Sequence, residues 1–277
     1  MKAGLSTTAN GTNEDLTSQH YWEDNWKRKS ERSWGKLDWV HRQYNWCSWD
    51  QILRLRVKPE KGTRLLEVGC AGGKWLVYFH KTFGYSVTGC DYSEIGCAMA
   101  RRSLEAAGID GTVLQQDLFT LTGEFDVIYS HGLIEHFDNP RKVLEKFVSL
   151  LNPSHGTLIS AVPNIQGLSG LYNRLLKPET FTTHRVITLE ELQRWHEEIG
   201  LKKIQVGALG SFVPFMFPRD KIRKEHPRFY RLFWGAFLHP LTWSTNRFCI
   251  WLLKRFGVRI ESQRFSPYLY AIGEMGS

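Results

Sequence analysis

Residues 64 to 73 read Arg-Leu-Leu-Glu-Val-Gly-Cys-Ala-Gly-Gly, and the rest of the chain can be interpreted from this stretch. Its apolar start is typical of a buried strand in a parallel sheet. Small residues follow at once, and apolar side chains at helical spacing begin after Lys74. A strand, a glycine-rich turn and a helix bring backbone N–H groups close to a bound ligand. The sequence therefore predicts a ligand site at the carboxyl end of this strand.

The glycine turn does not have the spacing of a dinucleotide site. That motif, Gly-x-Gly-x-x-Gly, counted from Gly69, would need glycine at the positions of Ala71 and Lys74. Glu67, two residues before the first glycine, instead places a carboxylate at the strand tip, where it can receive a cationic ligand group. The ligand expected here is therefore one that carries a positive charge.

Residues 67 to 73 resemble the Glu/Asp-x-Gly-x-Gly-x-Gly motif of class I S-adenosylmethionine-dependent methyltransferases. Ala71 stands in place of the middle glycine, which is expected to reduce how closely the backbone approaches the ligand. The resemblance covers about residues 60–207 and 265–275. It implies S-adenosyl-L-methionine as methyl donor and an α/β, Rossmann-like fold with a seven-stranded mixed sheet flanked by helices. The expected strands lie at about 65–68, 86–90, 113–118, 125–130, 156–162, 202–206 and, antiparallel, 267–273.

Asp91 follows the second expected strand, 22 residues after Gly69 (91 − 69), which is the length of one strand–helix–strand unit. An acidic residue at that strand tip can accept hydrogen bonds from both ribose hydroxyls of a nucleoside. The alternative is that Asp91 caps the following helix, a role that Ser93 already fills. The resemblance likewise implies that Asp91 holds the adenosine ribose.

Asp117 lies where the third strand enters a loop, and Leu118 follows it. By the resemblance, the Asp117 carboxylate accepts from the adenine amine and the Leu118 N–H donates to the ring; the alternative is an ordinary turn aspartate. The full set of expected cofactor-binding residues is Tyr21, Trp22, Glu67, Gly69, Cys70, Ala71, Gly72, Asp91, Tyr92, Asp117, Leu118, Ser130 and His131.

The fourth expected strand delivers ionisable residues to the edge of the sheet where ligands collect. Methyl transfer from a sulfonium is an in-line displacement, and a hydroxyl acceptor must also lose a proton to a base. The candidate catalytic residues are His131, Glu135 and His136, together with His184 from the segment where the family shapes its acceptor pocket. The alternative for Glu135 and His136 is a hydrogen-bonded pair within the scaffold.

A metal site is not expected. Quinone-type O-methyltransferases hold a divalent metal with a Glu-x-x-Glu-His pattern, and this pattern is incomplete here because Gly132 stands at the first Glu position. His131 lies next to Gly132, but the two residues that match the pattern are too few to hold a Mg²⁺ or Zn²⁺ ion.

Composition sets broad bounds on the class of protein. At 277 residues, 32.2 kDa and 42% hydrophobic content, the chain is long enough for one α/β domain with additional segments. The formal charge of +8 and the pI near 9.2 are compatible with a membrane surface, a nucleic acid or an acidic substrate. Five cysteines without a Cys-x-x-Cys pair suit reduced thiols in the cytoplasm. No apolar run approaches the ~18 residues that span a bilayer.

Three regions are expected along the chain. Residues 1–19 are polar and lack the apolar stretch of a signal peptide, so a disordered tail is expected. Residues 20–58 are rich in aromatic side chains and form an N-terminal helical cap. Residues 59–277 form the methyltransferase domain, with a helical insertion at 210–263. The rings of the cap either cover one end of the sheet or form a lid over the cofactor.

The insertion carries an apolar stripe at helical spacing, formed by Phe229, Leu232, Phe233, Ala236 and Phe237. Such a stripe is typical of a core or of a homodimer contact. Residues 228–256 also add tryptophan and basic side chains, which suit a peripheral contact with an anionic membrane.

The function expected first is methylation of a small-molecule acceptor, with O-methylation assisted by a side-chain base. The alternatives are a membrane-peripheral methyltransferase of a lipid or prenylated quinone, and a non-catalytic binding module. The module is disfavoured because Glu67, Asp91 and Asp117 are all intact. A nucleic-acid substrate is not expected, because the fourth strand lacks an Asn/Asp-Pro-Pro-Tyr-type tetrapeptide for base flipping. The acceptor itself cannot be read from the residues.

Overall fold

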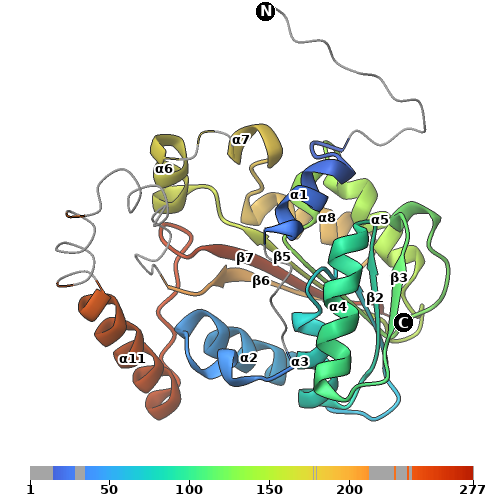
Figure 1. The fold of residues 1–277 in the computed structure, drawn as a ribbon, viewed down its shortest axis with the longest axis horizontal. Helices are drawn as coiled ribbons and strands as arrows, with labels where there is room; N and C mark the ends of the chain where they lie inside the picture. Colours follow the sequence, from blue (N-terminus) through green and yellow to red (C-terminus); the bar gives the residue numbers. More distant parts are fainter. Residues whose placement is uncertain are drawn as a thin grey trace, which may run out of the picture.

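A computed structural model describes residues 15–28, 35–176, 178, 180–211, 228, 236 and 239–276 (Figure 1). Its centre is a seven-stranded sheet in the order β3-β2-β1-β4-β5-β7-β6. The strands are β1 (Arg64–Val68), β2 (Ser86–Asp91), β3 (Thr112–Gln115), β4 (Val127–His131), β5 (Thr157–Pro163), β6 (Lys202–Leu209) and β7 (Tyr268–Glu274). Only β7 runs antiparallel to its neighbours, which confirms the predicted mixed sheet.

The helices cover both faces of this sheet (Figure 1). They are α1 (Gln19–Lys27), α2 (Tyr44–Arg56), α3 (Lys74–Phe83), α4 (Glu94–Ala107), α5 (Pro140–Ser149), α6 (Gly167–Leu176), α7 (Thr180–Thr183), α8 (Leu189–Glu198) and α11 (His239–Phe256), with 3₁₀ turns η1 (Asp38–His41), η2 (Leu118–Thr120) and η3 (Ile134–His136). The central strands are apolar on both faces because helices bury both: Leu65 of β1 packs with α2 and α3, whereas Leu66 packs with α5 and α8.

Local signals in the sequence account for where the helices begin. The Ser93 hydroxyl accepts from the Gly96 N–H and caps α4. Thr188 and Glu191 form a capping box at the start of α8. Asn139 caps α5, and Pro140 is its first residue, where a missing N–H costs nothing.

The glycine turn after β1 explains why alanine is accepted in the motif. Gly69, Gly72 and Gly73 have positive φ angles of 77°, 87° and 69°, whereas Ala71 does not have a positive φ. A side chain is therefore unstrained at position 71 but strained at the other three. A Cβ at position 73 would also lie 2.8 Å from the Ala100 Cα of α4. Ala71 therefore fits the turn without backbone strain, and its expected effect on the approach to the ligand stays a prediction.

Order begins earlier in the chain than expected. The Leu16 N–H donates to the His136 carbonyl at 2.8 Å, Asp15 forms a β-bridge with Phe137, and Thr17 is buried. Residues 15 to 19 therefore belong to the folded part, and the expected tail boundary at residue 19 is wrong for them. Residues 1 to 14 lie outside the described part.

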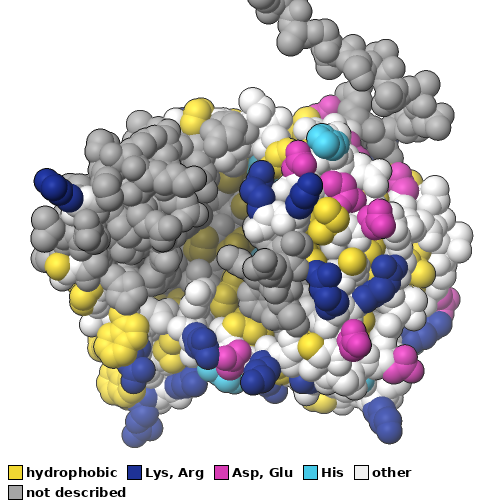
Figure 2. All heavy atoms as spheres, viewed as in Figure 1, with side chains coloured by type: hydrophobic (Ala, Val, Ile, Leu, Met, Phe, Trp, Pro, Cys, Tyr) yellow, Lys and Arg dark blue, Asp and Glu magenta, His cyan; other side chains and the backbone are white. Residues whose placement is uncertain are grey.

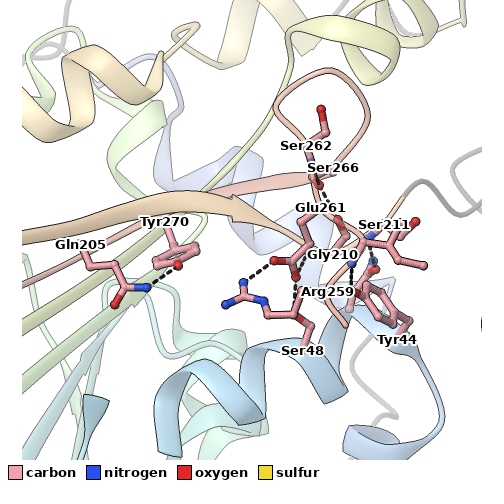
Figure 3. Close-up of polar contacts among 12 residues, drawn as sticks. Tyr44, Ser48, Gln205, Gly210, Ser211, Arg259, Glu261, Ser262, Ser266 and Tyr270 are labelled. Atoms are coloured by element: carbon pink, nitrogen blue, oxygen red, sulfur yellow. Dashed lines mark hydrogen bonds and ion pairs between the residues drawn. The ribbon is translucent and has the colours of Figure 1, made fainter. Parts of the chain in front are cut away.

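The chain between β6 and β7 is tied to the N-terminal cap (Figure 3). The Glu261 carboxylate accepts from the Ser48 hydroxyl of α2 and from the Gly210 N–H, and it pairs with Arg259. The Tyr44 hydroxyl accepts from the Ile260 N–H at 2.6 Å. The inner face of α11 packs on α2 through a small buried cluster of Tyr44, Cys47, Cys249 and Leu253. Most of the apolar stripe predicted over residues 229 to 237 lies outside the described residues.

Candidate active site

A cavity of about 810 Å³ opens at the carboxyl ends of β1, β2 and β4, and α1 and α2 contribute to its wall. This volume falls in the range of small-molecule sites. Its lining includes nine of the expected cofactor-binding residues: Trp22, Glu67, Gly69, Ala71, Asp91, Tyr92, Asp117, Leu118 and His131. Four others do not line it, namely Tyr21, Cys70, Gly72 and Ser130. Cys70 and Ser130 are buried, and Tyr21 is 40% exposed beside Trp22.

Asp91 stands at the end of β2 with its carboxylate held by the glycine turn. One oxygen accepts from the Ala71 N–H at 3.1 Å, and the other accepts from the Ser93 N–H at 2.9 Å. The Ser93 hydroxyl caps α4, so Asp91 is not needed for that role. Burial raises the pKa of Asp91 to about 6. The geometry suits acceptance of two ribose hydroxyls by an ionised carboxylate.

Donor binding is therefore expected to depend on pH. Because Asp91 must be ionised to accept two hydroxyls, the affinity for S-adenosylhomocysteine should be constant above about pH 6. Below that pH it should fall by about tenfold per unit. Calorimetry between pH 5 and 7.5 measures this, with Asp91→Asn as the control because it cannot titrate. Asp15, at the same cavity, has its pKa raised to about 6 by burial and by Asp117, so a slope that persists in Asp91→Asn would assign the effect to Asp15.

Asp117 makes the contact of a turn aspartate and also borders the cavity. Its Oδ1 accepts from the Phe119 N–H at 2.7 Å and caps η2. The buried Leu118 follows it along the cavity wall. The turn contact is therefore present, and the adenine contact stays a prediction for the second carboxylate oxygen.

Lys74 lines the cavity, and three tryptophan rings surround its ammonium group as a cage. Its Nζ lies 3.5 Å from the ring centroid of Trp46, 3.8 Å from that of Trp39 and 4.8 Å from that of Trp75. Glu67, also on the cavity, is 4% exposed, and its Oε2 lacks a hydrogen-bond partner. Burial lowers the pKa of Lys74 to about 7 and raises that of Glu67 to about 8. The low-dielectric cage thus shifts both groups toward their neutral forms.

His131 is set up as a hydrogen-bond donor. The Trp49 indole N–H donates to the Tyr129 hydroxyl at 3.0 Å, and that hydroxyl lies 3.0 Å from His131 Nδ1. All three groups are satisfied when the Tyr129 O–H donates to Nδ1, which leaves the ring proton of His131 on Nε2. Burial, followed by the charge of Lys74, lowers the pKa of His131 to about 3. A neutral His131 in this tautomer can donate to a ligand but does not offer a free lone pair for a base.

His136 and His184 differ from His131 in which ring nitrogen carries the proton. His136 Nδ1 lies 2.7 Å from the Thr183 carbonyl oxygen, and His184 Nδ1 lies 3.1 Å from that of Thr180. A carbonyl only accepts, so His136 Nδ1 carries the proton and its Nε2 keeps a lone pair. His184 Nδ1 also lies 2.9 Å from the Thr183 hydroxyl oxygen, and the tautomer with the proton on Nδ1 lets both oxygens accept from it. His136 borders the cavity, where Trp22 packs edge-on with ring centroids 4.9 Å apart. Of the four expected catalytic residues, His136 is thus the one that borders the cavity and keeps a lone pair on a ring nitrogen, and that nitrogen lies 3.6 Å from Glu135 Oε1.

Glu135 lies behind His136. Its Oε1 is 3.6 Å from His136 Nε2, and neither carboxyl oxygen has a hydrogen-bond partner in the described structure. The side chain is 2% exposed, and burial raises its pKa to about 8. The His136 and His184 ring centroids are 4.3 Å apart. We call Glu135, His136 and His184 the EHH cluster.

Comparison with known proteins gives the family. The sequence pattern described as a methyltransferase domain matches residues 39–206, which is more than half of the chain. The chain belongs to the methyltransferase domain family. The motif of residues 67 to 73 and the mixed sheet are those of the class I members of this family, which use S-adenosyl-L-methionine.

Curated relatives of this methyltransferase include an enzyme named ubiquinone biosynthesis O-methyltransferase. The protein from Coxiella burnetii (strain RSA 331 / Henzerling II) is 29% identical over 157 residues, which is 53% of this chain and 66% of the relative. The match thus spans slightly less than two thirds of that relative. A cyclopropane-fatty-acyl-phospholipid synthase of Escherichia coli (strain K12) is 37% identical over 83 residues, which is 30% of this chain and 21% of the relative.

Solved structures share the fold of this methyltransferase at low sequence identity. A methyltransferase from Thermotoga maritima matches with a TM-score of 0.56 at 18% identity, covering 93% of this chain and 100% of the other. Phosphoethanolamine N-methyltransferase 2 of Haemonchus contortus, bound to S-adenosylhomocysteine, has a TM-score of 0.58 at 16% identity, with 93% and 58% covered.

The methyltransferase site contains residues that sequence reasoning missed. Lys74 was interpreted only as a helix start, and the tryptophans of its cage come from three elements, η1, α2 and α3. Trp46 and Tyr268 line the cavity from segments more than 200 residues apart, 46 to 268. No spacing pattern reveals such contacts. The one available signal was the unusual position of a lysine directly after the glycine turn.

Proposed function

We propose that this methyltransferase transfers the methyl group of S-adenosyl-L-methionine to an oxygen atom of a small-molecule acceptor. The observation that carries the proposal is a single cavity that joins Asp91 and Asp117 with His136. The carboxylates suit the adenosine half of the donor, and Glu67 lies at the strand tip, where the cationic half would be. His136 borders the same cavity with a free Nε2 lone pair.

The proposed step is a displacement at the methyl carbon. The acceptor oxygen forms a bond to the methyl group while the bond from carbon to the sulfonium sulfur breaks, which leaves S-adenosylhomocysteine. The hydroxyl proton passes to Nε2 of His136, whose Nδ1–H remains on the Thr183 carbonyl. Trp22, against His136, covers the reacting groups and helps to exclude water.

A direct assay tests the proposal. The full chain is incubated with methyl-labelled S-adenosyl-L-methionine and with matched acceptors that differ only in carrying a hydroxyl, an amine or neither. Hydroxylated aromatic compounds with apolar side chains come first, because a relative is named for ubiquinone biosynthesis. A labelled methyl ether is expected. Label transferred only to the amines would overturn the O-methylation proposal.

A second candidate, a methyltransferase that works at a membrane surface, rests on α11. Figure 2 shows hydrophobic and basic side chains gathered over this helix at the lower left. Its inner face is buried on α2, and its outer face exposes large apolar side chains, each more than half exposed: Leu241, Trp243, Phe248, Trp251 and Phe256. Arg247 lies over the Trp243 ring, and Arg255 lies over Phe256. The helix carries no acidic residue, so its charge complements an anionic bilayer.

Vesicle binding tests this candidate. Wild-type protein is expected to sediment with vesicles of one third phosphatidylserine at low salt, and binding should weaken at moderate salt, because basic side chains contribute. The double variant Trp243→Ser/Trp251→Ser should stay in the supernatant, because both rings are on the exposed face. Tyr21→Ser, which removes an exposed ring from α1, is the matched control. Equal binding of all three proteins, or a dimer that the double variant dissociates, would exclude the membrane role. Within the described residues no helix is both long and apolar enough to cross a bilayer.

A further inference from the structure

The EHH cluster unites residues that are far apart in the sequence. His184 follows Glu135 by 49 residues (184 − 135) and reaches it from the end of α7. One donor atom from each of the three side chains lies within 4.8 Å of the other two. Glu135 and His136 are buried, and His184 is half-buried.

Both imidazoles are held as metal ligands usually are. A histidine that binds a metal through one ring nitrogen almost always donates its other N–H to a carbonyl or a carboxylate. His136 does this to the Thr183 carbonyl at 2.7 Å. His184 Nδ1 lies 3.1 Å from the Thr180 carbonyl and 2.9 Å from the Thr183 hydroxyl oxygen, and both accept from it in the tautomer that leaves a lone pair on Nε2. The two Nε2 lone pairs are therefore those that a cation would meet.

Glu135 supplies an independent observation. Its carboxyl group is 2% exposed, yet neither oxygen accepts a hydrogen bond in the described structure. A buried carboxyl group without hydrogen bonds is costly, and His136 Nε2 lies 3.6 Å from its Oε1. That distance is beyond a hydrogen bond, so His136 does not satisfy the carboxyl group. A cation between the three donors would satisfy all of them.

We propose that Glu135, His136 and His184 bind one divalent transition-metal ion. Two imidazoles and one carboxylate are a donor set typical of Zn²⁺ and of Fe²⁺, whereas Mg²⁺ prefers oxygen ligands. The cluster therefore selects Zn²⁺ or a similar ion over Mg²⁺. Donors around tetrahedral Zn²⁺ lie about 3.4 Å apart, so the side chains close by about 1 Å when the ion binds. The expectation of no metal, drawn from the position of Gly132, overlooked a third donor that only the fold supplies.

The site also bears on the proposed methyl transfer. Three protein donors leave at least one position of the ion open. Because His136 borders the cavity, an acceptor hydroxyl bound there can fill that position and become more acidic. With the ion bound, His136 would act as a ligand and the acceptor proton would be lost to solvent. This role rests on the proposed function, but binding of the ion itself does not.

The test measures metal binding without donor or acceptor. The full chain is stripped with a chelator and titrated with Zn²⁺ and with Mg²⁺ in a calorimeter, and with Co²⁺ while visible absorption is recorded. One Zn²⁺ per chain is expected, bound at least 100-fold more tightly than Mg²⁺. Co²⁺ should give the intense visible bands of a low-coordinate site with nitrogen ligands.

The variants locate the site. His184→Gln and Glu135→Gln should each weaken Zn²⁺ binding by tenfold or more and reduce the Co²⁺ bands. His41→Gln, which changes an exposed histidine of η1, should change neither. Glu135 is buried, so His184→Gln, at the half-buried position, keeps the test valid if Glu135→Gln fails to fold. Zn²⁺ binding that is absent, or unchanged in His184→Gln, would overturn the proposal. A chain that binds Zn²⁺ as expected but methylates no acceptor would leave the site standing and reject the proposed function.

Discussion

Replacing His136 with glutamine is expected to lower the turnover number by ~10²–10⁴, the range typical of losing a general acid–base group. His136 borders the cavity and keeps a lone pair on Nε2, whereas glutamine cannot act as a base at that position. Binding of S-adenosylhomocysteine should be nearly unchanged, because the expected donor contacts come from Asp91 at the end of β2 and from Asp117 in the loop after β3, whereas His136 belongs to η3. Initial rates with the acceptor found by the labelling assay, together with calorimetry of the donor product, measure the two effects.

Two matched variants make this result specific. His41→Gln alters an exposed histidine and should retain the wild-type rate. His131→Gln keeps a side-chain N–H donor in place of the Nε2–H and should lose less activity than His136→Gln. A near-wild-type rate in a folded His136→Gln protein would show that the residue belongs to the scaffold, as the alternative from sequence holds.

Asp91→Ala is expected to weaken donor binding by ~1–3 kcal/mol, because two ribose hydroxyls would lose their acceptor in a buried place. This corresponds to about 5- to 150-fold in the dissociation constant. Part of the loss comes from the glycine turn, since the Ala71 N–H also loses its partner at 3.1 Å. Asp91→Asn keeps one acceptor oxygen and should fall between wild type and Asp91→Ala.

The control for this series is Asp110→Ala, which removes an exposed carboxylate and the same charge. Thermal unfolding of each variant shows whether the fold persists. An unchanged affinity for S-adenosylhomocysteine in folded Asp91→Ala would refute the ribose assignment.

The sheet could be predicted because its signals are local. Each parallel strand is a short apolar run, and turn or capping residues such as Ser93 and Thr188 mark where the next helix begins. The observed ends of a strand or helix differ from the predicted ends where contacts with another element lengthen it. Strand β6 continues to Leu209 because it pairs with β7 as far as Tyr268.

The candidate site was predictable only in part. Glu67, Asp91 and Asp117 follow from the order of strands, because parallel strands end at one edge. The hydrogen bonds that distinguish His131 from His136 could not be foreseen. The bond of His131 depends on the Tyr129 hydroxyl. The bond of His136 depends on the Thr183 carbonyl, which is 47 residues away in the sequence (183 − 136).

The five cysteines are all buried and unpaired, and their positions divide them into two groups. Cys47 and Cys249 belong to the buried cluster where α2 meets α11, whereas Cys70, Cys90 and Cys97 lie in and around the glycine turn. A thiol-reactive reagent can modify a buried cysteine only after the surrounding structure opens. Labelling followed by mass spectrometry therefore separates two events. Detachment of α11 exposes the first pair alone, and unfolding of the sheet exposes all five.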